Sequence, residues 1–440
     1  MRKNVLFFML LGIFSGISSL TSCNKDDLEQ TPYDPEQPIG LESYSPKEGG
    51  VGTQLIIRGE NFGYDASKVK VWLDNDEDRA ARVISARGNR IYAVIPARAG
   101  TGKVTVSIDD GGGNSQTVQF EDEFQYEFQS NLSTLCGGAR EEDVDGAFNV
   151  AQFVRPYRLA LDDENQQLFV LECDNSKCLR IVDLANETVS TPWRAPGLHN
   201  LRTLCFGINT DTLFVGVEGG SANLSTVYLL RTDGFVRHKT YAQQSGSNAS
   251  TVNPVDGELF INNYYDGYIY HYNRETHTME PQVRAFNTNT DFTYCWSADG
   301  SDLFALSVNV STIVKMDYNF ETKQLSEPIA WVGNGTNGYS DGIGLEALIN
   351  LPFQMCNGGE NEYFLADTYN HCIRRIVENP EAGTATVTTY AGVGGQEGYT
   401  EGVPTEALLR YPVGVAAAKD GSTVYVADKD NNRIVKITVE

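Results

Sequence analysis

Catalytic residue types and motifs are scarce in this chain of 440 residues. It holds 5 histidines, and none of them lies in an H-E-x-x-H pattern. The chain contains no G-x-S-x-G nucleophile elbow, no Walker loop and no C-x-x-C pair. The sequence therefore offers no motif for metal-dependent hydrolysis, serine catalysis, phosphate binding or dithiol chemistry. We expect no catalytic residue, no metal and no cofactor.

Positive charge is also in short supply. Lysine and arginine total 34 against 58 acidic residues, which gives a formal net charge of −24. Nucleic acids and anionic membrane surfaces bind proteins through clustered cations, and no basic patch is present here. The composition therefore argues against both as partners. It is compatible with neutral or cationic ligands and specifies none of them.

An apolar run at residues 5–20 follows Arg2 and Lys3. It is short and interrupted by glycine and serine, which is typical of a secretory signal peptide rather than a membrane span. The sequence L-T-S-C at residues 20–23 resembles the lipobox of bacterial lipoproteins. That resemblance implies cleavage after residue 22 and a lipid on the thiol of Cys23. The alternative is an ordinary signal peptide followed by a chance cysteine.

The sequence N-K-D-D at residues 24–27 resembles the export signal of surface lipoproteins in some Gram-negative bacteria. We therefore expect an outer membrane lipoprotein that is exposed at the cell surface. Residues 23–39 are polar and contain three prolines without any periodicity, so they are expected to form the lipidated N-terminus and a linker.

No amphipathic helical pattern of twelve or more residues follows. The segment 40–128 instead has short apolar runs between Gly- and Asn-rich turns, and Leu55 and Ile57 alternate with Gln54 and Ile56 as in a half-buried strand. The patterns P-x-x-G-G, I-x-G-x-N-F-G and then I-P-A resemble an IPT/TIG domain. This resemblance implies an immunoglobulin-like sandwich that serves as a spacer or interaction module.

Three later segments, 168–182, 363–377 and 424–438, align with one another without gaps. Each has a hydrophobic strand, an acidic turn of the form Asp-x-x-Asn and a second strand. This order resembles the NHL repeat of β-propellers. The first copy departs from it at Glu172 and Cys178. In the turns, we expect Asp367 and Asp428 to accept backbone N–H bonds and the asparagines to adopt left-handed geometry.

Weaker copies at 213–217, 259–263 and 303–307 keep the strand and lose the turn. Six copies of roughly 50 residues each fit four-stranded blades. We therefore predict an all-β protein, with an immunoglobulin-like sandwich at 40–128 and a six-bladed NHL-type β-propeller at 129–440. Residues 132–136 resemble the outermost strands of later repeats, so we expect them to complete the last blade and close the ring.

The innermost strands carry small residues at one repeated position. Cys205, Cys295 and Cys356 align there with Ala160 and Ala416, which predicts buried free thiols. Cys173 and Cys178 flank a turn and are candidates for a disulfide, although separate thiols are favoured.

Two positions earlier, the aligned residues are mostly polar. They are Arg158, Thr203, Ser250, Thr293, Gln354 and Gly414. If these side chains point into the channel mouth, they either order water there or bind a hydroxyl-rich ligand. We include Arg158 and Gln354 among the candidate ligand contacts.

The third repeat replaces the usual turn with Asn263, Tyr264, Tyr265 and Asp266. These residues are expected between the second and third strands, on the face where propellers commonly bind ligands. Tyrosine rings stack on sugar C–H faces, and amides and carboxylates bind hydroxyl groups. All four are candidate ligand contacts. The alternative is an aromatic turn that packs on a neighbouring blade.

These features favour a non-catalytic surface lipoprotein that captures an extracellular polysaccharide or oligosaccharide and works with outer-membrane uptake proteins. Two other functions stay open. NHL propellers often bind proteins, which would make the chain a cell-surface scaffold. A propeller hydrolase or lyase is less favoured, and Glu172, Glu218, Asn263 and His199 are the residues that it would have available.

Overall fold

The computed structural model describes residues 32–173, 176–195, 197–218 and 224–439. The predicted signal peptide and Cys23 lie outside the described residues. The chain divides into two compact units, Met1–Phe128 and Gln129–Glu440. Regular structure in the described part consists of β-strands and single-turn 3₁₀ helices, and no helix there is long and apolar enough to cross a membrane.

The first unit is a sandwich of two sheets. One sheet has the order β1 (Gly40–Ser45), β3 (Gln54–Glu60), β6 (Arg90–Val94) and β5 (Arg82–Arg87). The other has the order β2 (Glu48–Gly49), β8 (Ser115–Tyr126), β7 (Gly102–Asp109) and β4 (Val69–Trp72). Leu55 and Ile57 are fully buried between the sheets while Gln54 is exposed, which confirms the predicted alternation.

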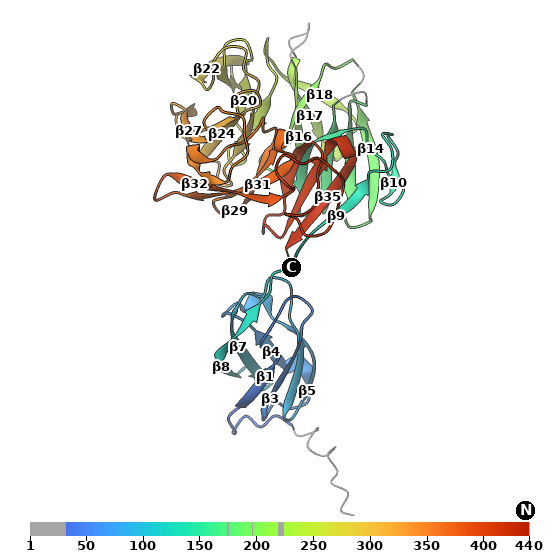
Figure 1. The fold of residues 1–440 in the computed structure, drawn as a ribbon, viewed down its shortest axis with the longest axis vertical. Coiled ribbons are helices and arrows are strands. Elements are labelled where there is room, and N and C mark those ends of the chain that lie inside the picture. Colours follow the sequence, from blue (N-terminus) through green and yellow to red (C-terminus); the bar gives the residue numbers. More distant parts are fainter. Residues whose placement is uncertain (1–31, 174–175, 196, 219–223, 440) are drawn as a thin grey trace, which may run out of the picture. The chain divides into compact units, whose positions relative to one another are not determined.

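The second unit is a propeller of six sheets, which we number as blades 1 to 6 along the chain (Figure 1). Strands are listed from the innermost outward. Blade 1 has β11 (Pro156–Asp162), β12 (Gln167–Glu172), β13 (Cys178–Asp183), β14 (Thr188–Arg194) and β10 (Gly146–Ala147). Blade 2 has β15 (Leu201–Phe206), β16 (Thr212–Val217), β17 (Leu224–Leu230) and β18 (His238–Gln243). Blade 3 has β19 (Ser250–Val252), β20 (Leu259–Asn262), β21 (Tyr268–Asn273) and β22 (Thr278–Arg284).

The other three blades follow the same plan. Blade 4 has β23 (Phe292–Trp296), β24 (Asp302–Ser307) and β25 (Thr312–Asn319), which pairs with both β26 (Gln324–Leu325) and β27 (Ile329–Val332). Blade 5 has β29 (Met355–Gly359), β30 (Glu362–Asp367), β31 (Cys372–Asn379), β32 (Thr384–Ala391) and β28 (Gly342–Ile343). Blade 6 has β33 (Pro412–Ala417), β34 (Thr423–Asp428), β35 (Arg433–Val439) and β9 (Ser130–Gly137).

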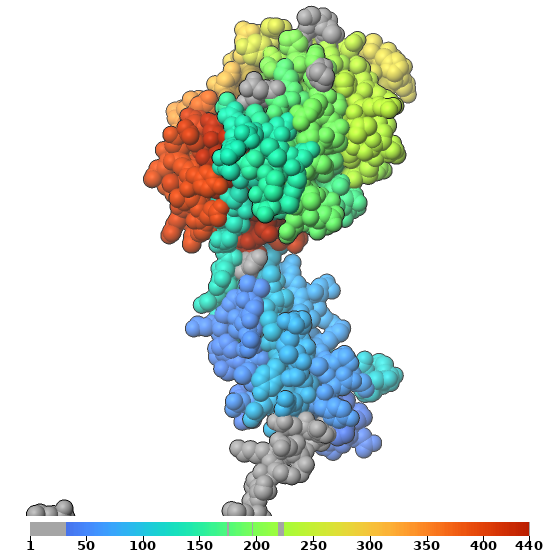
Figure 2. Space-filling view, turned by 90° about the vertical axis from the view of Figure 1, so that its right-hand side faces the viewer, coloured from blue at the N-terminus to red at the C-terminus, as the bar shows by residue number. Residues whose placement is uncertain are grey.

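The ring is closed by β9, which pairs antiparallel with β35 and joins Cys136 to Ile434 and Ser133 to Lys436. The predicted closure is thereby confirmed. Figure 2 shows early propeller residues (cyan) against late ones (orange and red) at this seam. The open edge of β9 is covered in part, because the backbone of Leu132 exchanges two hydrogen bonds with Gly402.

The second strand of every blade carries an aromatic residue of the core at one equivalent position. The six residues are Phe169, Phe214, Phe260, Phe304, Phe364 and Tyr425, and all are buried. Burying such a ring is worth about 2–3 kcal/mol. This repeated contribution explains why the hydrophobic strand persists even in the blades whose turns have diverged.

Candidate functional site

One end of the propeller gathers the loops that follow the second strands and the segments that precede the innermost strands. In blade 3, the backbone of Tyr264 donates to Gly246 at 2.8 Å and accepts from Asn289 at 2.8 Å. Gly246 precedes β19 and Asn289 precedes β23. We call this end the rim face. It is where the candidate tyrosines were expected, and their place between the second and third strands is confirmed.

Tyr265 is the most exposed side chain of this loop, with 63% of its surface accessible. The ring of the half-buried Tyr264 meets it edge-on, with centroids 5.6 Å apart and planes at 77°. Below it lies Gly246, where an added Cβ would come within 2.5 Å of Tyr265 Cδ2. The absence of a side chain at Gly246 therefore lets the Tyr265 ring rest on backbone and face outward.

The polar residues beside the rings fix the loop. Asn263 Oδ1 accepts the N–H of Tyr265 at 2.9 Å. Asp266 accepts the N–H of Tyr268 and the hydroxyl of Tyr270, each at 2.8 Å. Burial and the Asp266 hydrogen bond raise the pKa of Tyr270 to about 12. The Asn263 amide nitrogen makes no hydrogen bond within the described part of the chain, so it can donate to a ligand beside Tyr265.

In the structure, members of the predicted polar ring at the axis form hydrogen bonds that join different blades. Arg158 is only 2% exposed. Its Nε donates to the carbonyl of Arg202 at 2.7 Å, and its Nη1 donates to the carbonyl of Phe353. Gln354 accepts from the N–H of Leu159 at 3.2 Å and donates to its carbonyl at 2.7 Å. Blades 1 and 5 are thus joined across the axis.

Three further ring members take part in the same closure. Thr203 Oγ1 donates to the carbonyl of Ser250 at 2.8 Å, and Thr293 Oγ1 donates to the carbonyl of Phe353 at 3.0 Å. An added Cβ at Gly414 would lie 2.7 Å from the carbonyl oxygen of Tyr157, so glycine lets the innermost strands of blades 6 and 1 pack closely together. These bonds engage the ring members, and a ligand role for Arg158 and Gln354 stays a prediction.

Above these ties, an ion pair spans the mouth. Arg202 of blade 2 binds Asp291, which precedes the inner strand of blade 4. Asn248 Nδ2 also donates to Asp291, at 2.9 Å. The Arg202 and Asp291 side chains are 18% and 23% exposed, so the pair forms part of the rim-face surface. Because the charges are paired with each other, this mouth favours neutral ligands over free anions.

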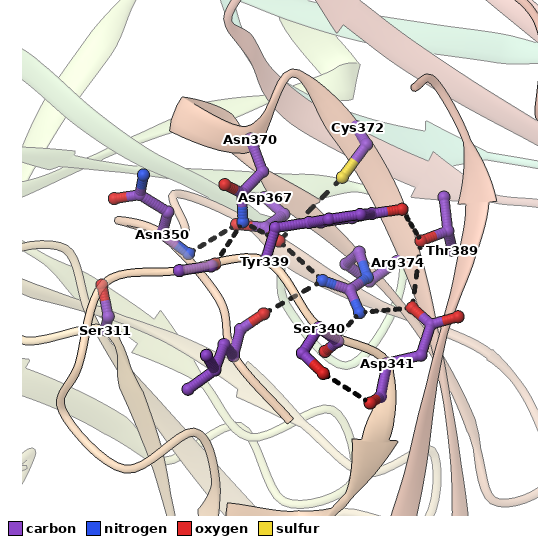
Figure 3. A network of polar contacts seen from close by, with 12 residues as sticks. Ser311, Tyr339, Ser340, Asp341, Asn350, Asp367, Asn370, Cys372, Arg374 and Thr389 are labelled. Atoms are coloured by element: carbon purple, nitrogen blue, oxygen red, sulfur yellow. Dashed lines mark hydrogen bonds and ion pairs between the residues drawn. The ribbon is translucent and has the colours of Figure 1, made fainter. Parts of the chain in front are cut away.

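A buried guanidinium network lies under the rim face of blade 5 (Figure 3). Arg374 is fully buried and pairs with Asp367 at 3.0 Å and Asp341 at 2.7 Å. The ring of Tyr339 covers its guanidinium at 5.0 Å. Burial raises the pKa of Asp367 to about 6, although Asn370 and Arg374 act in the opposite direction.

This network corrects the expected role of the Asp-x-x-Asn turn. Asp367 accepts the N–H of Asn350, from the segment before β29, and not an N–H of its own turn. The left-handed residue is His371, with φ of 55°, and not Asn370. Asn370 instead uses its side chain, which donates to Asp367 at 2.8 Å and to the carbonyl of Gly338 at 2.7 Å. The motif therefore anchors the preceding loop.

Blades 1 and 6 repeat the network. In blade 1, Arg180 pairs with Glu172 at 3.0 Å and Asp145 at 3.0 Å. In blade 6, Arg433 pairs with Asp428 at 2.7 Å, and the ring of Tyr399 lies 3.7 Å from its guanidinium. The sequence reasoning missed these arginines as a set. The sequence signal for them is the same in all three blades. The second strand ends in an acidic residue, and the third strand carries an arginine.

Three potential metal ligands meet at the blade 1 network. One atom each of Asp143, Glu172 and Cys178 lies within 4.8 Å of the others. Arg180 already supplies positive charge there, at 3.3 Å from Asp143 and 3.0 Å from Glu172. Burial raises the pKa of the Cys178 thiol and keeps it protonated. The two carboxylates of this set are engaged in the salt bridges to Arg180.

The axial cysteines are free thiols as predicted. Cys295 is buried, while Cys205 and Cys356 are partly buried. Burial raises the pKa of Cys205 to about 11 and that of Cys295 to about 12. Cys173 and Cys178 form no disulfide in the described part of the chain. The axial thiols are therefore packing residues with little thiolate character at neutral pH.

A cleft of about 690 Å³ opens beside β9 at the closing seam. Leu135, Cys136 and Tyr425 are among its apolar lining residues, and Lys436 and Glu187 are among its polar ones. Its lining extends along β9 from Ser133 to Gly137 and includes Gln166 and Glu187, which lie in turns of blade 1 at the end opposite the rim face. It does not join the tyrosine loop.

Comparison with family models identifies both units. Residues 38–121 match the IPT/TIG domain, and residues 409–437 match the NHL repeat. The chain combines an IPT/TIG domain with an NHL-repeat propeller. The second match covers β33 to β35 of blade 6, where the sequence repeat was also most regular.

Solved structures share this combination. An auxiliary nutrient binding protein from Bacteroides ovatus is 26% identical, with a TM-score of 0.68 over 93% of this chain and 100% of that one. An auxiliary nutrient binding protein from Bacteroides thetaiotaomicron is 27% identical, with a TM-score of 0.65 over 93% and 99%. Another B. thetaiotaomicron structure, provisionally described as a phosphatase, is 24% identical over 93% of this chain and shows the fold alone, with a TM-score of 0.66.

The curated relatives are much longer than this chain. The chloroplastic protein SUPPRESSOR OF QUENCHING 1 of Arabidopsis thaliana is 25% identical over 305 residues, which are 68% of this chain and 26% of that protein. Human NHL repeat-containing protein 2 is 33% identical over 104 residues, which are 23% of this chain and 14% of that protein. The match thus spans about a quarter or less of each relative.

Proposed function

We propose that this protein is a non-catalytic accessory of nutrient capture that binds an extracellular polysaccharide or oligosaccharide on the rim face of its propeller. The observation that carries the proposal is the outward-facing ring of Tyr265, 63% exposed and held in place over Gly246. A pre-positioned aromatic surface loses little conformational entropy when a ligand stacks on it.

The chemistry around this ring suits a sugar. Stacking on Tyr265 requires an apolar face with C–H groups, and the nearby Asn263 amide and Asp266 carboxylate can bind hydroxyl groups. Both charged groups of the Arg202–Asp291 pair are already neutralised by each other. Together with the chain charge of −24, this favours a neutral glycan over an acidic one.

The relatives support the same class of function. Two structures with the same architecture over 93% of this chain are named auxiliary nutrient binding proteins. Carried over to this chain, that name fits a binding protein which hands its ligand to outer-membrane uptake proteins. We extend the proposal to its location and place the protein at the cell surface, anchored through a lipid on Cys23.

The test replaces Tyr264 and Tyr265 with alanine and measures retention in native gels that contain neutral polysaccharides, namely starch, dextran, xylan, mannan and β-glucan. The wild-type protein should be retarded by at least one of them, and the double variant should migrate as it does in a gel without polysaccharide. Tyr64→Ala is the matched control, because Tyr64 is 58% exposed and lies in the IPT/TIG domain. Equal retardation of the double variant would remove these tyrosines from the site.

The enzymatic alternative predicts a metal on the axis, or a histidine and an acid within hydrogen-bond reach in a deep cleft. His271 and Glu258 do meet, at 2.8 Å, but their side chains are only 8% and 12% exposed. Arg274 also binds Glu258. The contact therefore resembles an internal tie of blade 3 more than a reactive pair. A product assay on any polysaccharide that is retained separates binding from cleavage.

A further inference from the structure

A second group of aromatic side chains lies on the rim face, between blades 5 and 6. Tyr369 is 46% exposed and follows β30, the second strand of blade 5. It occupies the same loop in blade 5 that Tyr264 and Tyr265 occupy in blade 3. Its backbone N–H donates to the carbonyl of Asn350, before β29, at 3.2 Å, so this loop lies at the same end of the propeller.

The ring of Tyr369 is supported from blade 6. Tyr411 precedes β33 and meets Tyr369 edge-on, with centroids 5.3 Å apart and planes at 86°. His371 meets the same Tyr411 ring at 4.5 Å and 83°. Two rings therefore fix the position of Tyr411, and Tyr369 is the outermost of the three. The arrangement repeats the edge-on pair seen in blade 3.

His371 is only 8% exposed and supports the Tyr411 ring from inside the protein. Its Nδ1 accepts the backbone N–H of Tyr411 at 3.2 Å, so the hydrogen of the neutral ring is on Nε2. Burial lowers the pKa of His371, which keeps the ring neutral at pH 7. No hydrogen bond in the described part of the chain uses Nε2. The neutral imidazole therefore adds no charge beneath the aromatic surface of Tyr369 and Tyr411.

The charged groups around these rings are paired with each other. Arg410 binds Glu397 at 3.2 Å, and Arg155 binds Asp430 at 2.8 Å. Like Arg202 and Asp291 at the mouth, the two members of each pair compensate each other's charge. The two aromatic groups of the rim face therefore present the same chemistry.

We infer that Tyr369 and Tyr411, supported by His371, form a second carbohydrate subsite, and that one glycan chain lies across the rim face on both subsites. This inference rests on the proposed function and adds the length of the ligand to it. Blade 4 separates the tyrosine loops of blades 3 and 5. Each loop lies between the second and third strands, about 7 Å outside the innermost strand of its blade at a strand spacing of about 4.8 Å. Blades 3 and 5 of the six are a third of a turn apart around the axis, so the two loops are on the order of 20 Å apart. A single sugar unit cannot touch both, so the ligand is a chain of several units.

Two linked contacts strengthen binding because the second contact forms within a complex that already exists. Affinity should therefore rise steeply once an oligosaccharide is long enough to reach both subsites. Shorter oligosaccharides should bind to either subsite alone and weakly.

The experiment measures Kd by calorimetry for malto-, xylo-, manno- and cello-oligosaccharides from disaccharides upward, together with size-fractionated dextran fragments. For the series that binds, wild-type affinity should increase with length and then level off. Tyr369→Ala should bind short members with the wild-type Kd at the Tyr265 subsite but at one site instead of two, and long members about tenfold or more weakly. Tyr369→Phe keeps the ring and should bind like the wild type. Unchanged thermal unfolding of both variants confirms that they are folded.

The outcomes separate the two proposals. If Tyr265→Ala weakens binding and Tyr369→Ala leaves it unchanged at every length, the second subsite is wrong and the proposed function stands. If wild-type affinity does not depend on length, the spanning ligand is also wrong. If the wild-type protein binds no member of any series and none of the polysaccharides in the gel test, the proposed function itself fails.

Discussion

The missing side chain at Gly246 determines how Tyr265 is presented. Gly246 has φ of 71°, and an added Cβ would meet Tyr265 Cδ2 at 2.5 Å. Gly383, in the turn between β31 and β32, has φ of 63° and no atom within 4 Å of an added Cβ. An alanine at either position would therefore lose about 1–2 kcal/mol of stability because of its left-handed backbone. Only at position 246 would its Cβ also contact the Tyr265 ring.

We predict that Gly246→Ala weakens polysaccharide retention about tenfold while Gly383→Ala leaves it unchanged. The physical reason is that only the first substitution displaces the Tyr265 ring. Retardation in native gels measures the effect, and thermal unfolding should show similar losses of stability for both variants. Equal retention by the two variants would show that the position of this ring does not matter for binding.

Neighbouring arginines of β31 offer a matched test of burial. Arg374 is fully buried and pairs with two carboxylates, whereas Arg375 is 46% exposed and pairs with Glu362. Arg374→Met leaves Asp367 buried without its charge partner, which should cost about 3–5 kcal/mol of unfolding free energy. Arg375→Met should cost less than about 1 kcal/mol. Urea denaturation measures both, and similar costs would contradict the structural role of the network.

The limits of sequence reasoning are also visible at single residues. Tyr369 is hidden inside a repeat motif whose other positions are structural, so the pattern gave no sign of its exposure. Arg433 pairs in register with Asp428, whereas in blade 5 that position is Cys372 and the arginine stands two residues later. Gap-free alignment therefore did not superpose guanidinium groups that occupy equivalent places in space.

At the scale of elements, periodicity was sufficient. Repeated hydrophobic strands predicted six blades, and the resemblance of residues 132–136 to later outer strands predicted the closing strand. The ties across the axis were not predictable, because the contacts of Arg158 and Gln354 join segments that are far apart in the sequence. The alignment predicted that these side chains lie at the same height along the propeller axis. It could not show whether they point to solvent or to a neighbouring backbone.

The closing strand is held by a contact that depends on pH. Glu401 Oε1 accepts the N–H of Thr134 in β9 at 3.0 Å. Hydrogen bonds from the side chain and backbone of Thr134, with Arg433 nearby, hold the pKa of Glu401 below its ordinary value of 4.5. A lowered pKa means that the contact stabilises the folded ring above pH 4.5 and is lost as the pH falls through the folded-state value.

We therefore predict that Glu401→Gln is less stable than the wild type at neutral pH and that the difference shrinks toward zero in acid. Urea denaturation across a pH series measures this difference. Glu406→Gln, on the same loop, is the control and should show no such trend. A difference that grows below pH 4.5 would contradict the assigned direction.

At the scale of the whole molecule, the proposed location depends on the N-terminal segment. We predict that radiolabelled palmitate is incorporated into the wild-type protein in a Gram-negative host and not into Cys23→Ala, which should leave the membrane fraction. Cys173→Ala should be labelled like the wild type. Replacing Asp26 and Asp27 with alanine should preserve labelling and reduce digestion by protease added to intact cells. Labelling of Cys23→Ala would refute the lipid anchor.

The pairing of β9 with β35 also sets the order in which the protein can mature. A ribosome makes β9 as the first strand of the propeller and its partner as the last. The newly made chain must therefore carry β9 unpaired until nearly all of the propeller has been translated. A transcript cut short before β35 yields blades that cannot be joined into a ring, so a stable product reports that synthesis reached its final strand.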